Sequence, residues 1–333
     1  MKLSVIISPW RCEESVIRVI YRSTQQTLQK EDYEIIIVDR TPSSFYGDAV
    51  EILKTSSNAS LEYLVLDGAS RARASNTGLR KASNEVTLFL AEDFVPSFNL
   101  FQGHLAFHRV SPAAAKAVSG VVVWDPCLPF TDLRRWLELN IITIPQIPEN
   151  QHLHPLNTGC ANFSVKKKFL EENGFFDEDY HYEAYDDIDL AVRLNGAGLT
   201  VTLDPKLIAY HDDAFDLEEL TRRWRFVGRS ARLFDVKHPN LRPNIEPQDA
   251  TQAIQMILLQ CAISSSLSTI TGLRAAKEYH YLKTLELAFI RGYNDLTAVN
   301  PLHTPPNQGE AWFGKSSKEM LRDMIEESRK LGR

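Results

Sequence analysis

The sequence has little cysteine, and none of it is arranged as metal sites or disulfide frameworks usually are. The four cysteines among 333 residues are Cys12, Cys127, Cys160 and Cys261. No two of them stand in a CxxC pattern, so a zinc ribbon is excluded and a disulfide scaffold is not indicated. Sparse, unpaired cysteines are typical of a reducing compartment. We therefore predict a cytoplasmic protein.

The chain also lacks a long uninterrupted apolar run. Its apolar start, residues 3–8, is short, β-branched and ended by Pro9, which predicts a buried strand rather than a signal peptide. The longest charge-free stretch of interest, residues 253–273, contains glutamine, serine and threonine. It is too polar to span a membrane, and we expect a packed helix there.

Positive charge is in deficit overall. The 37 Lys and Arg residues against 43 Asp and Glu residues give a net charge of −6, which argues against a protein that coats nucleic acid. With 44% hydrophobic and 24% charged residues, the chain is an ordinary globular protein rather than a disordered or collagen-like one. At roughly 150 residues per domain, its length favours about two domains.

Continuous apolar runs and helical patterns alternate over the first ninety residues. Strands are expected at 3–8, 34–38, 61–66 and 86–90, with helices at 13–27, 49–53 and 69–82. Strands without polar alternation are covered on both faces, and helices between them make the sheet mostly parallel. Ligands of such α/β sheets bind at the carboxyl ends of the strands, so the residues that follow each strand are the first candidates for chemistry.

The pattern changes after residue 90. We expect a helix at 98–110, strands at 117–123 and 160–165, a helix at 186–195, and two short strands, 199–203 and 207–210, around Asp204-Pro205. Residues 126–157, rich in Pro and His, predict a long binding loop. From residue 216 onward only helices are expected, at 216–236, 248–266, 272–292 and 316–331. We therefore divide the chain into residues 1–213 and an all-helical region, 214–333.

Eight short motifs follow one another in an order that resembles glycosyltransferase family 2. They are SVIISP (4–9), EIIIVD (34–39), ASNTGL (74–79), LFLAED (88–93), GCANFSV (159–165), GFFDE (174–178), YDDIDLAVRL (185–194) and DP…YH (204–211). Together they cover about residues 3–212. The resemblance implies a GT-A nucleotide-sugar-binding fold. It also implies inverting transfer from a nucleoside-diphosphate sugar, UDP-sugars favoured, to a hydroxyl of a glycan, a lipid-linked or a small-molecule acceptor.

The resemblance places the nucleotide base at the first two strands. Asp39 would accept a hydrogen bond from an N–H of the base, since a carboxylate only accepts, and Ser8 and Pro9 would flank the base. From the residues alone, Asp39 could equally be a turn or helix-cap aspartate. Arg40 stands where the family usually has a second acid. It would either contact base or phosphate or be a solvated turn residue.

The helix after Gly68 carries the candidates for the diphosphate. Arg71 and Arg73 lie at its start, where a helix N-terminus and cationic side chains attract phosphate. The alternative is a solvated helix face. Asn76 is counted with the donor-binding residues, although packing of this helix on the sheet is its more obvious role.

The segment LFLAED stands where the family carries its metal motif. The resemblance implies a divalent cation, Mn²⁺ or Mg²⁺, held by Asp93 and completed by His211, with Glu92 beside the donor. However, Ala91 replaces the first Asp of the motif. Three readings follow: Asp93 holds the metal with the diphosphate, arginine replaces the metal, or the protein binds sugar nucleotides with impaired or no catalysis.

An acidic pair opens the helix expected at 186–195. The resemblance makes Asp187 the general base that takes the proton of the acceptor hydroxyl. Asp186 would support it or compensate the helix dipole. Asp189 and Arg193 are four residues apart and could form an ion pair. Weaker acceptor-site candidates are Trp124, Gly159, Glu183 and Tyr185.

The last feature is a basic segment at residues 221–242. It has seven Lys or Arg residues and one acid, Asp235, with aromatic residues between them. Such a helix either lies on an anionic membrane surface, which would suit a lipid-linked acceptor, or packs on the first region with a solvated basic face. The remaining helices would cover the acceptor site or form a homo-oligomer contact. A dinucleotide-dependent oxidoreductase is a weak third alternative, because no GxGxxG follows the first strand.

Overall fold

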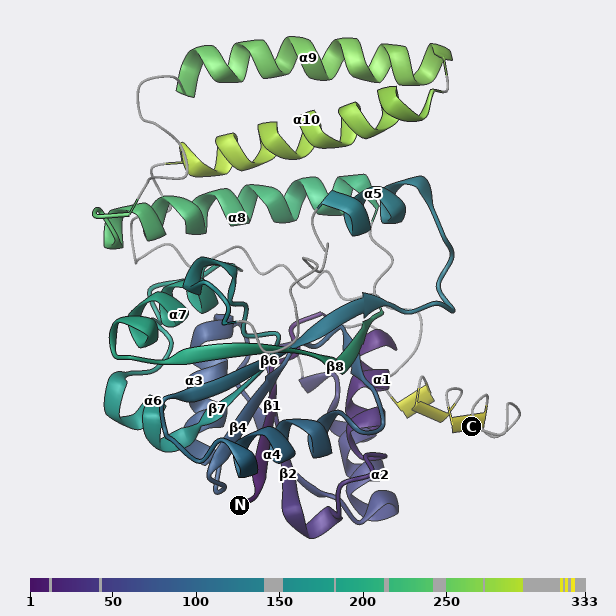
Figure 1. Cartoon of the computed structure of the whole chain (residues 1–333). Helices are drawn as coiled ribbons and strands as arrows, with labels where there is room; N and C mark the ends of the chain where they lie inside the picture. The colour runs from purple at the N-terminus through teal and green to yellow at the C-terminus, as the bar shows by residue number, and fades with distance from the viewer. Residues whose placement is uncertain are drawn as a thin grey trace.

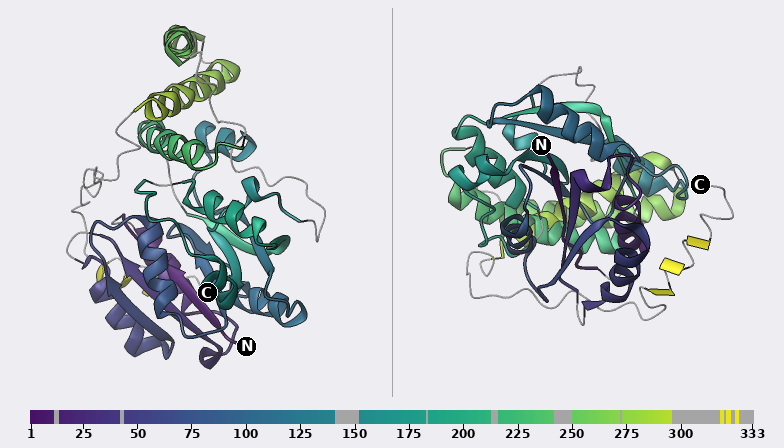
Figure 2. Two further views of the ribbon diagram at one scale, coloured as in Figure 1. Left: turned by 90° about the vertical axis from the view of Figure 1, so that its left-hand side faces the viewer. Right: turned by 90° about the horizontal axis from the view of Figure 1, so that it is seen from below.

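The structure is a computed structural model that describes most of the chain. The described residues are 1–11, 14–41, 44–140, 152–182, 184–212, 216–241, 250–271 and 273–295, with a few residues between 318 and 326. A stack of long helices lies on one side of an α/β part, as Figure 1 and the turned views of Figure 2 show.

An eight-stranded sheet forms the centre of the α/β part, in the order β3-β2-β1-β4-β7-β6-β8-β5. Its strands are β1 (Leu3–Ile7), β2 (Tyr33–Asp39), β3 (Ser60–Val65), β4 (Val86–Leu90), β5 (Phe94–Pro96), β6 (Lys116–Trp124), β7 (Asn162–Lys166) and β8 (Thr200–His211). The pairs β1–β2, β2–β3, β1–β4 and β6–β8 are parallel, whereas β7 and β5 run antiparallel to their neighbours. The predicted mostly parallel α/β sheet is confirmed.

Helices cover both faces of this sheet, because its central strands are apolar on both sides. Val5 and Ile7 pack in one core cluster with residues of α1 and α4, whereas Ile6 packs in another with residues of α3 and α7. The helices of the α/β part are α1 (Glu14–Ser23), α2 (Gly47–Ser57), α3 (Arg71–Lys81), α4 (Leu100–Val110), α6 (Lys167–Asn173) and α7 (Asp186–Gly196), with short 3-10 turns η1 (Lys30–Asp32) and η3 (Pro155–Asn157).

Strand β8 corrects one prediction. The two short strands expected at 199–203 and 207–210 form a single strand that Asp204-Pro205 does not end. Its pairing with β6 shifts register here: Ser119 faces Leu203, and the next printed pair is Val121 with Ile208. Pro205 lacks an N–H, and it lies in the stretch between these pairs, where the β6 ladder needs no donor from it.

Four helices lie on one side of the α/β part, with α8 nearer to it than α10 and α9: α5 (Asp132–Asn140), α8 (Leu217–Lys237), α9 (Ala250–Thr271) and α10 (Arg274–Tyr293). Helix α10 lies between α8 and α9 (Figures 1 and 2). Helix α5 falls inside the predicted loop 126–157, of which residues 141–151 lie outside the described residues. The few described residues of the tail helix expected at 316–331 are helical, and the division at 213 and 214 stays a prediction.

Two glycines set how closely α8 and α10 approach. A Cβ on Gly292 would lie 1.8 Å from the carbonyl oxygen of Arg225, and one on Gly228 would lie 2.0 Å from that of Phe289. Neither backbone can retreat without separating the helices. We therefore expect Gly292→Ala to lower the free energy of unfolding by about 1–3 kcal/mol, measured by urea denaturation.

The matched control for this substitution is Gly196→Ala. A Cβ at Gly196 meets nothing within 4 Å. Alanine is the better helix former by about 1 kcal/mol, so this control should be neutral or stabilising. Equal stability of Gly292→Ala and the wild type would show that α8 and α10 are not in the close contact described.

Candidate active site

A cavity of about 160 Å³ lies where the carboxyl ends of β1, β2 and β4 meet the end of β8. Its wall takes residues from the loops after these strands, from α3, from the segment before β7 and from α8. The lining residues are Ile6, Ser8, Arg11, Arg40, Arg71, Ser75, Phe89, Leu90, Ala91, Glu92, Asp93, Phe94, Cys160, Ala161, Phe176, His211 and Arg223. This is the edge at which α/β sheets bind ligands.

The wall of the cavity is rich in positive charge. Four arginines line it, Arg11, Arg40, Arg71 and Arg223, against two acids. A cleft with such an excess attracts anions, and guanidinium groups suit phosphate oxygens. The lining of the cavity therefore favours an anionic ligand.

Two of these arginines were missed by the sequence reasoning. Arg11 lies just after β1, at the predicted ligand-binding edge of the sheet, but it belongs to none of the eight motifs. Arg223 lies in the basic segment 221–242. Its position in the wall becomes visible only when α8 packs over the sheet, and no local pattern reports that contact.

Arg11 connects the acids of the cavity with helix α8. Its Nε lies 3.2 Å from Glu92 Oε1, its second guanidinium nitrogen 3.4 Å from Asp93 Oδ2, and the third 3.5 Å from Glu219 Oε1 on α8. Glu92 Oε2 also accepts a hydrogen bond of 2.6 Å from the backbone N–H of Trp10. These contacts fix the loop after β1 against the segment after β4.

Asp93 and His211 lie together, because β5 pairs antiparallel with the end of β8. His211 Nε2 is 3.7 Å from Asp93 Oδ2, and the imidazole lies between the rings of Trp124 and Phe94, with centroid distances of 4.5 and 5.2 Å. Burial opposes ionisation of Asp93, but the positive charges of His211, Arg11 and Arg223 outweigh it and hold the pKa of the carboxyl below its usual range.

This pair was predicted to hold a divalent cation. Among the residues that the structure describes, no group of three or more His, Cys, Asp or Glu side chains could hold a metal ion. Asp93 and His211 nevertheless offer a carboxylate and an imidazole, which are donors that Mn²⁺ accepts. Mg²⁺ too is commonly held by one or two protein groups and completed by substrate phosphates. Asp93 and His211 fit a cation whose remaining ligands come from substrate phosphates.

The acidic pair lies at the start of α7, after an unusual backbone. Ala184 and Tyr185 have φ of 68° and 64°, the left-handed region that non-glycine residues rarely adopt. Each such residue costs of order 1–3 kcal/mol and persists only where the surroundings enforce it, commonly at functional sites. The turn delivers Asp186 and Asp187 toward the cavity.

The two acids differ in their surroundings. Asp186 is 1% exposed and receives two guanidinium hydrogen bonds from Arg71, one of 2.9 Å from Nε to Oδ2. Burial raises the pKa of Asp186, and the pair with Arg71 opposes that rise. Asp187 is more accessible, with a side chain 14% exposed, and its Oδ2 lies 3.4 Å from Arg71. Asp187 is therefore the more exposed carboxylate of the pair, whereas Asp186 is the counterion of Arg71.

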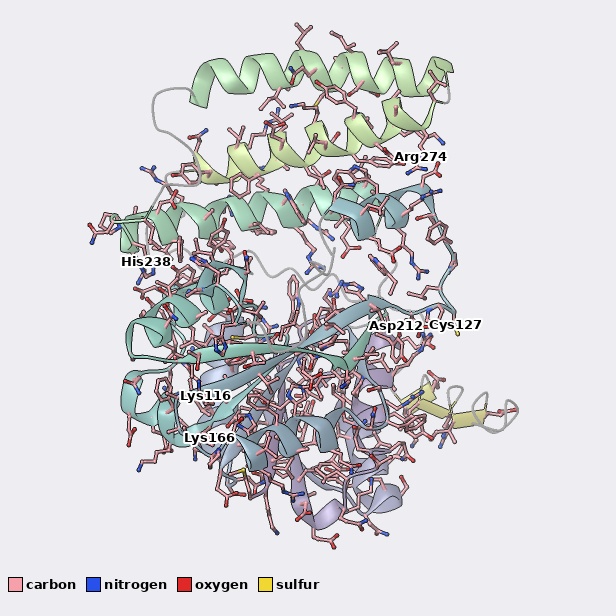
Figure 3. All side chains as sticks on the ribbon, viewed as in Figure 1. Lys116, Cys127, Lys166, Asp212, His238 and Arg274 are labelled. Carbon is pink, nitrogen blue, oxygen red and sulfur yellow. The ribbon has the colours of Figure 1, made fainter. Side chains whose placement is uncertain are left out.

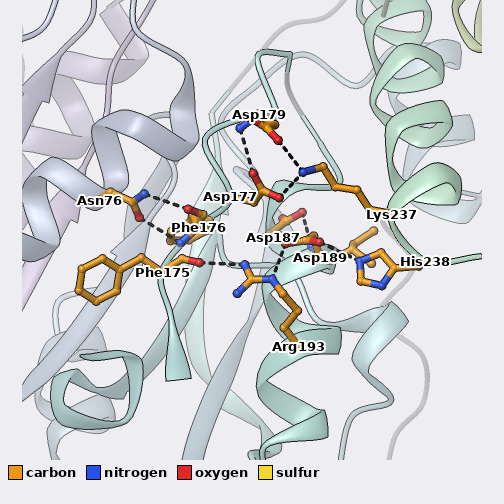
Figure 4. Close-up of polar contacts among 11 residues, drawn as sticks. Asn76, Phe175, Phe176, Asp177, Asp179, Asp187, Asp189, Arg193, Lys237 and His238 are labelled. Carbon is orange, nitrogen blue, oxygen red and sulfur yellow. Dashed lines mark hydrogen bonds and ion pairs between the residues drawn. The ribbon is translucent and has the colours of Figure 1, made fainter. Parts of the chain in front are cut away.

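The other donor-site candidates occupy different places. Arg71 lines the cavity, whereas Arg73 is exposed. Asn76 donates to the carbonyl oxygen of Phe176 at 2.9 Å and accepts from its N–H at 3.0 Å, so it joins α3 to the segment before α7 (Figure 4). Ser8 lines the cavity, and its carbonyl oxygen accepts a bond of 2.8 Å from Arg40.

Asp39 is fully buried at the end of β2, and its carboxylate is already hydrogen-bonded. Oδ1 accepts from the N–H and the hydroxyl of Thr41 at 2.8 and 2.6 Å. Oδ2 accepts from the N–H of Tyr46 at 3.2 Å and from the hydroxyl of Tyr63. Pro9 adjoins this site, since its carbonyl oxygen accepts the N–H of Arg40 at 2.8 Å.

The acceptor-site candidates surround Asp187 and His211. A Cβ on Gly159 would lie 3.6 Å from Asp187 Oδ2, an ordinary van der Waals distance, so Gly159 lies directly beside this carboxylate. The Trp124 ring packs against His211 with the two planes tilted by 49°, and the ring of Tyr185 packs on Phe234 of α8 at 5.3 Å. Glu183 lies outside the described residues.

Lys237 at the end of α8 and His238 just after it contact three acids, Asp177, Asp179 and Asp189 (Figure 4). Lys237 Nζ lies 2.6 Å from Asp177 and 2.7 Å from Asp179, and His238 Nε2 lies 2.8 Å from Asp189. Asp189 also accepts from Arg193 Nε at 2.8 Å, which confirms the predicted i, i+4 pair. The end of α8 thus helps to hold α7 and the segment before it in place.

Comparison with known proteins gives one family and several distant relatives. The model of the family described as Glycosyl transferase family 2 matches residues 4–170. A pre-mycofactocin glycosyltransferase of Mycobacterium tuberculosis (strain CDC 1551 / Oshkosh) is 28% identical over 172 residues, 51% of this chain and 36% of the relative. A validoxylamine A glucosyltransferase of Streptomyces hygroscopicus subsp. limoneus is 23% identical over 273 residues, 73% of this chain and 58% of the relative. This chain thus spans about a third to somewhat over half of these relatives.

Solved structures share the fold. The mannosyltransferase PcManGT from Pyrobaculum calidifontis, in complex with GDP-Man and Mn²⁺, superposes with a TM-score of 0.61 at 14% identity, covering 89% of this chain and 88% of that chain. Residues 1–349 of TarS from S. aureus give a TM-score of 0.50 at 14% identity, covering 86% of this chain and 90% of that chain. At this identity the likeness concerns the fold alone.

Proposed function

We propose, since this chain belongs to glycosyl transferase family 2 and has a GT-A fold, that it transfers a sugar from a nucleoside-diphosphate sugar to a hydroxyl group of an acceptor. The observation that carries the proposal is the arginine-lined cavity at the carboxyl ends of the strands, with an accessible carboxylate, Asp187, held beside it by Arg71. The arginines would bind the leaving diphosphate, and Asp187 would take the proton of the acceptor hydroxyl.

The donor would bind with its diphosphate among Arg11, Arg71 and Arg223. When the bond between the sugar carbon and the diphosphate breaks, negative charge grows on the leaving oxygen, and these guanidinium groups are already in place to stabilise it. The base would lie toward Ser8 and Asp39, and we favour uracil. Because both oxygens of Asp39 already accept bonds, the base N–H would have to replace one donor, and the half-buried Tyr63 hydroxyl is the most exchangeable of them.

Asp187 would act as the general base. It would accept the proton of the acceptor hydroxyl while that oxygen attacks the sugar carbon opposite the diphosphate, which inverts the anomeric configuration. Asp186 would not take part in the proton transfer, since Arg71 already neutralises it. Its role would be to orient Arg71 between the acidic pair and the donor.

A divalent cation, Mn²⁺ or Mg²⁺, would be held by Asp93 and His211 and would supply further positive charge to the diphosphate. Arg11 contacts Asp93 Oδ2, the oxygen that also faces His211. The guanidinium and the cation would therefore both interact with this carboxylate. Glu92 would fix Arg11 rather than bind the metal.

The acceptor is expected to be a hydroxyl of a glycan, a lipid-linked sugar or a small molecule, bound between Gly159, Trp124 and Tyr185. A membrane contact through residues 221–242 has less support than the packed-helix alternative. Arg223 lines the cavity, Arg229 pairs with Asp295, and Lys237 pairs with Asp177. Within the part of the chain that the structure describes, no helix combines the length and apolar character needed to cross a bilayer.

Nucleotide binding tests the proposal most simply. In a thermal-shift panel of UDP, GDP, CMP and dTDP, with and without Mn²⁺, we expect UDP to give the largest rise in Tm, because a ligand that binds only the folded state stabilises it. Arg223→Met should reduce this rise and Asp93→Asn should remove the part that depends on Mn²⁺.

The control for Arg223→Met is Arg222→Met, which makes the same change of charge at an exposed neighbour on α8. It should leave the nucleotide-induced rise unchanged. Failure of every nucleotide to shift the wild type would contradict the proposed function. Binding without any turnover would favour the non-catalytic alternative that Ala91 suggests.

A further inference from the structure

A second cluster of buried polar side chains lies apart from the cavity, inside the α/β part. It consists of His104 and His108 on α4 and of Asn162, Ser164 and Lys166 on β7, all less than 9% exposed. Figure 3 labels Lys166, at the outer end of this cluster. None of these residues takes part in the proposed transfer, so their burial needs another explanation.

The five side chains form one continuous hydrogen-bonded series. Lys166 Nζ lies 3.2 Å from His108 Nδ1, and His108 Nε2 lies 2.9 Å from Ser164 Oγ. Ser164 Oγ lies 2.8 Å from His104 Nδ1, and His104 Nε2 lies 2.9 Å from Asn162 Oδ1. Asn162 Nδ2 then donates to the carbonyl oxygens of Val121, at 3.2 Å, and Leu207, at 3.0 Å.

Both ends of the series impose the same direction on its protons. Carbonyl oxygens only accept, so the Asn162 amide nitrogen must face them, and Asn162 Oδ1 must accept from a protonated His104 Nε2. His104 Nδ1 then accepts from the Ser164 hydroxyl, which in turn accepts from His108 Nε2–H. His108 Nδ1 is left to accept from the Lys166 ammonium. Every donor therefore has an acceptor only while both imidazoles are neutral Nε2–H tautomers.

The Asn162 amide donates hydrogen bonds at a point where the β6–β8 ladder is interrupted. The carbonyls of Val121 and Leu207 lie at the register shift between β6 and β8, where the ladder is interrupted. No side chain fits at Gly120 beside them, since a Cβ there would lie 2.2 Å from Leu207 O and 2.3 Å from Asn162 Nδ2. Asn162 thus replaces the missing ladder bonds and holds the two strands together at this point.

The strands on both sides of this register shift continue to the cavity. Beyond it β6 and β8 pair again, from Val121 with Ile208 as far as Trp124 with His211. On the other side of Asn162, the carbonyl oxygen of Ala161 accepts the N–H of Ala91 at 2.8 Å, and both residues line the cavity. Asn162 therefore contacts two parts of the cavity wall: β6 and β8, which run to Trp124 and His211, and the Ala161–Ala91 contact next to it in the chain.

We propose that Asn162, oriented by the series Lys166–His108–Ser164–His104, is a positioning residue for the cavity and sets the places of His211 and of the Ala161–Ala91 wall. This rests on the proposed function only in calling the cavity the donor site. Protonation of either histidine places a proton on Nδ1. His104 would then face the Ser164 hydroxyl with a donor, and His108 would face the Lys166 ammonium. The charged groups near the two rings, among described residues, are Lys166 and Asp204.

Hydrogen exchange of the ligand-free chain, followed by mass spectrometry, tests this proposal without any assumption about the donor. Ser164→Ala and Asn162→Asp break the series at its centre and at its end. We expect exchange in peptides covering residues 88–95 and 207–212 to become at least about tenfold faster, because opening at the wall amides becomes more frequent.

Two substitutions control for a general loss of stability. Ser23→Ala removes a buried hydroxyl that donates 2.7 Å to Val19 O, and Asn84→Asp removes an amide that donates 3.0 Å to Leu3 O, both away from the cavity. They should leave exchange at the wall unchanged. Equal acceleration by variants and controls, or none by the variants, would overturn the proposal. If the wall opens as expected but no nucleotide binds the wild type, the proposed function fails and the positioning role stands.

A measurement on the wild type covers the case in which the variants do not fold. Histidine ¹⁵N NMR at neutral pH should show His104 and His108 as neutral Nε2–H tautomers. An Nδ1–H tautomer or a charged ring at either position would contradict the series on which the proposal rests.

Discussion

Asp187→Asn is expected to lower the rate of nucleotide-sugar consumption by about 10²–10⁴-fold, the range that a general base contributes, with nucleotide affinity nearly unchanged. The amide keeps the shape of the carboxylate but cannot take the acceptor's proton. Asp187 contacts the N–H of Cys160 and the guanidinium of Arg71, yet it is not among the residues that line the arginine-rich cavity. The rate can be followed as nucleoside diphosphate release with water as acceptor.

The control is Asp48→Asn. Asp48 also lies in the first turn of a helix, α2, but is exposed there. Both substitutions remove a charge that favours the helix dipole, at about 0.3–1 kcal/mol of stability. Asp48→Asn should therefore retain wild-type turnover. Turnover by Asp187→Asn within a few-fold of the wild type would remove Asp187 as the base.

Acidification from pH 7 to pH 5 is expected to lower the free energy of unfolding by about 4 kcal/mol through His104 and His108 alone. Burial lowers the pKa of His104 to about 4. Burial, with the charges of Lys166 and His104, lowers the pKa of His108 to about 3. Both rings titrate near 6.5 in the unfolded chain, which therefore binds more protons than the folded chain between these values. This contribution to stability is complete above the unfolded pKa of about 6.5 and is lost as the pH falls to about 4 for His104 and to about 3 for His108.

Urea denaturation at several pH values between 7 and 5 measures this loss. His104→Gln replaces a titrating ring by an amide that can still donate and accept, so it should remove about half of the pH slope. His152→Gln, at an exposed histidine, should keep the full slope. If the slope is the same in all three proteins, the two buried histidines are not its cause.

Much of the fold could be predicted, because burial leaves a plain pattern in the sequence. The runs 34–38 and 86–90 are apolar on both faces, and only a covered strand in a parallel sheet accounts for that. Strand β8 was harder, since Asp204-Pro205 reads as a turn by local chemistry. It is tolerated because of a register shift on β6, and nothing in residues 199–210 indicates what their partner strand does.

The site was predictable only where motif order supplied the information. Arg71, Asp93 and His211 line one cavity, with Asp186 and Asp187 bonded to Arg71 beside it, although the sequence separates these residues by as many as 140 positions. Arg11 and Arg223 belong to no recognised motif, and their role depends on helix α8 meeting the loop after β1. His104 and His108 lie in the helix expected at 98–110, but only tertiary packing turns that face of α4 inward, and no local pattern indicates it.

The anomeric configuration of the sugar that leaves the donor tests the central claim most directly. Time-resolved ¹H NMR of the wild-type chain with α-linked UDP-glucose, UDP-N-acetylglucosamine and GDP-mannose would identify the first product before mutarotation. We expect that one of these donors is consumed, that its nucleoside diphosphate is released, and that the sugar first appears as the β anomer. Release of the α anomer, or consumption of none of the three, would contradict it.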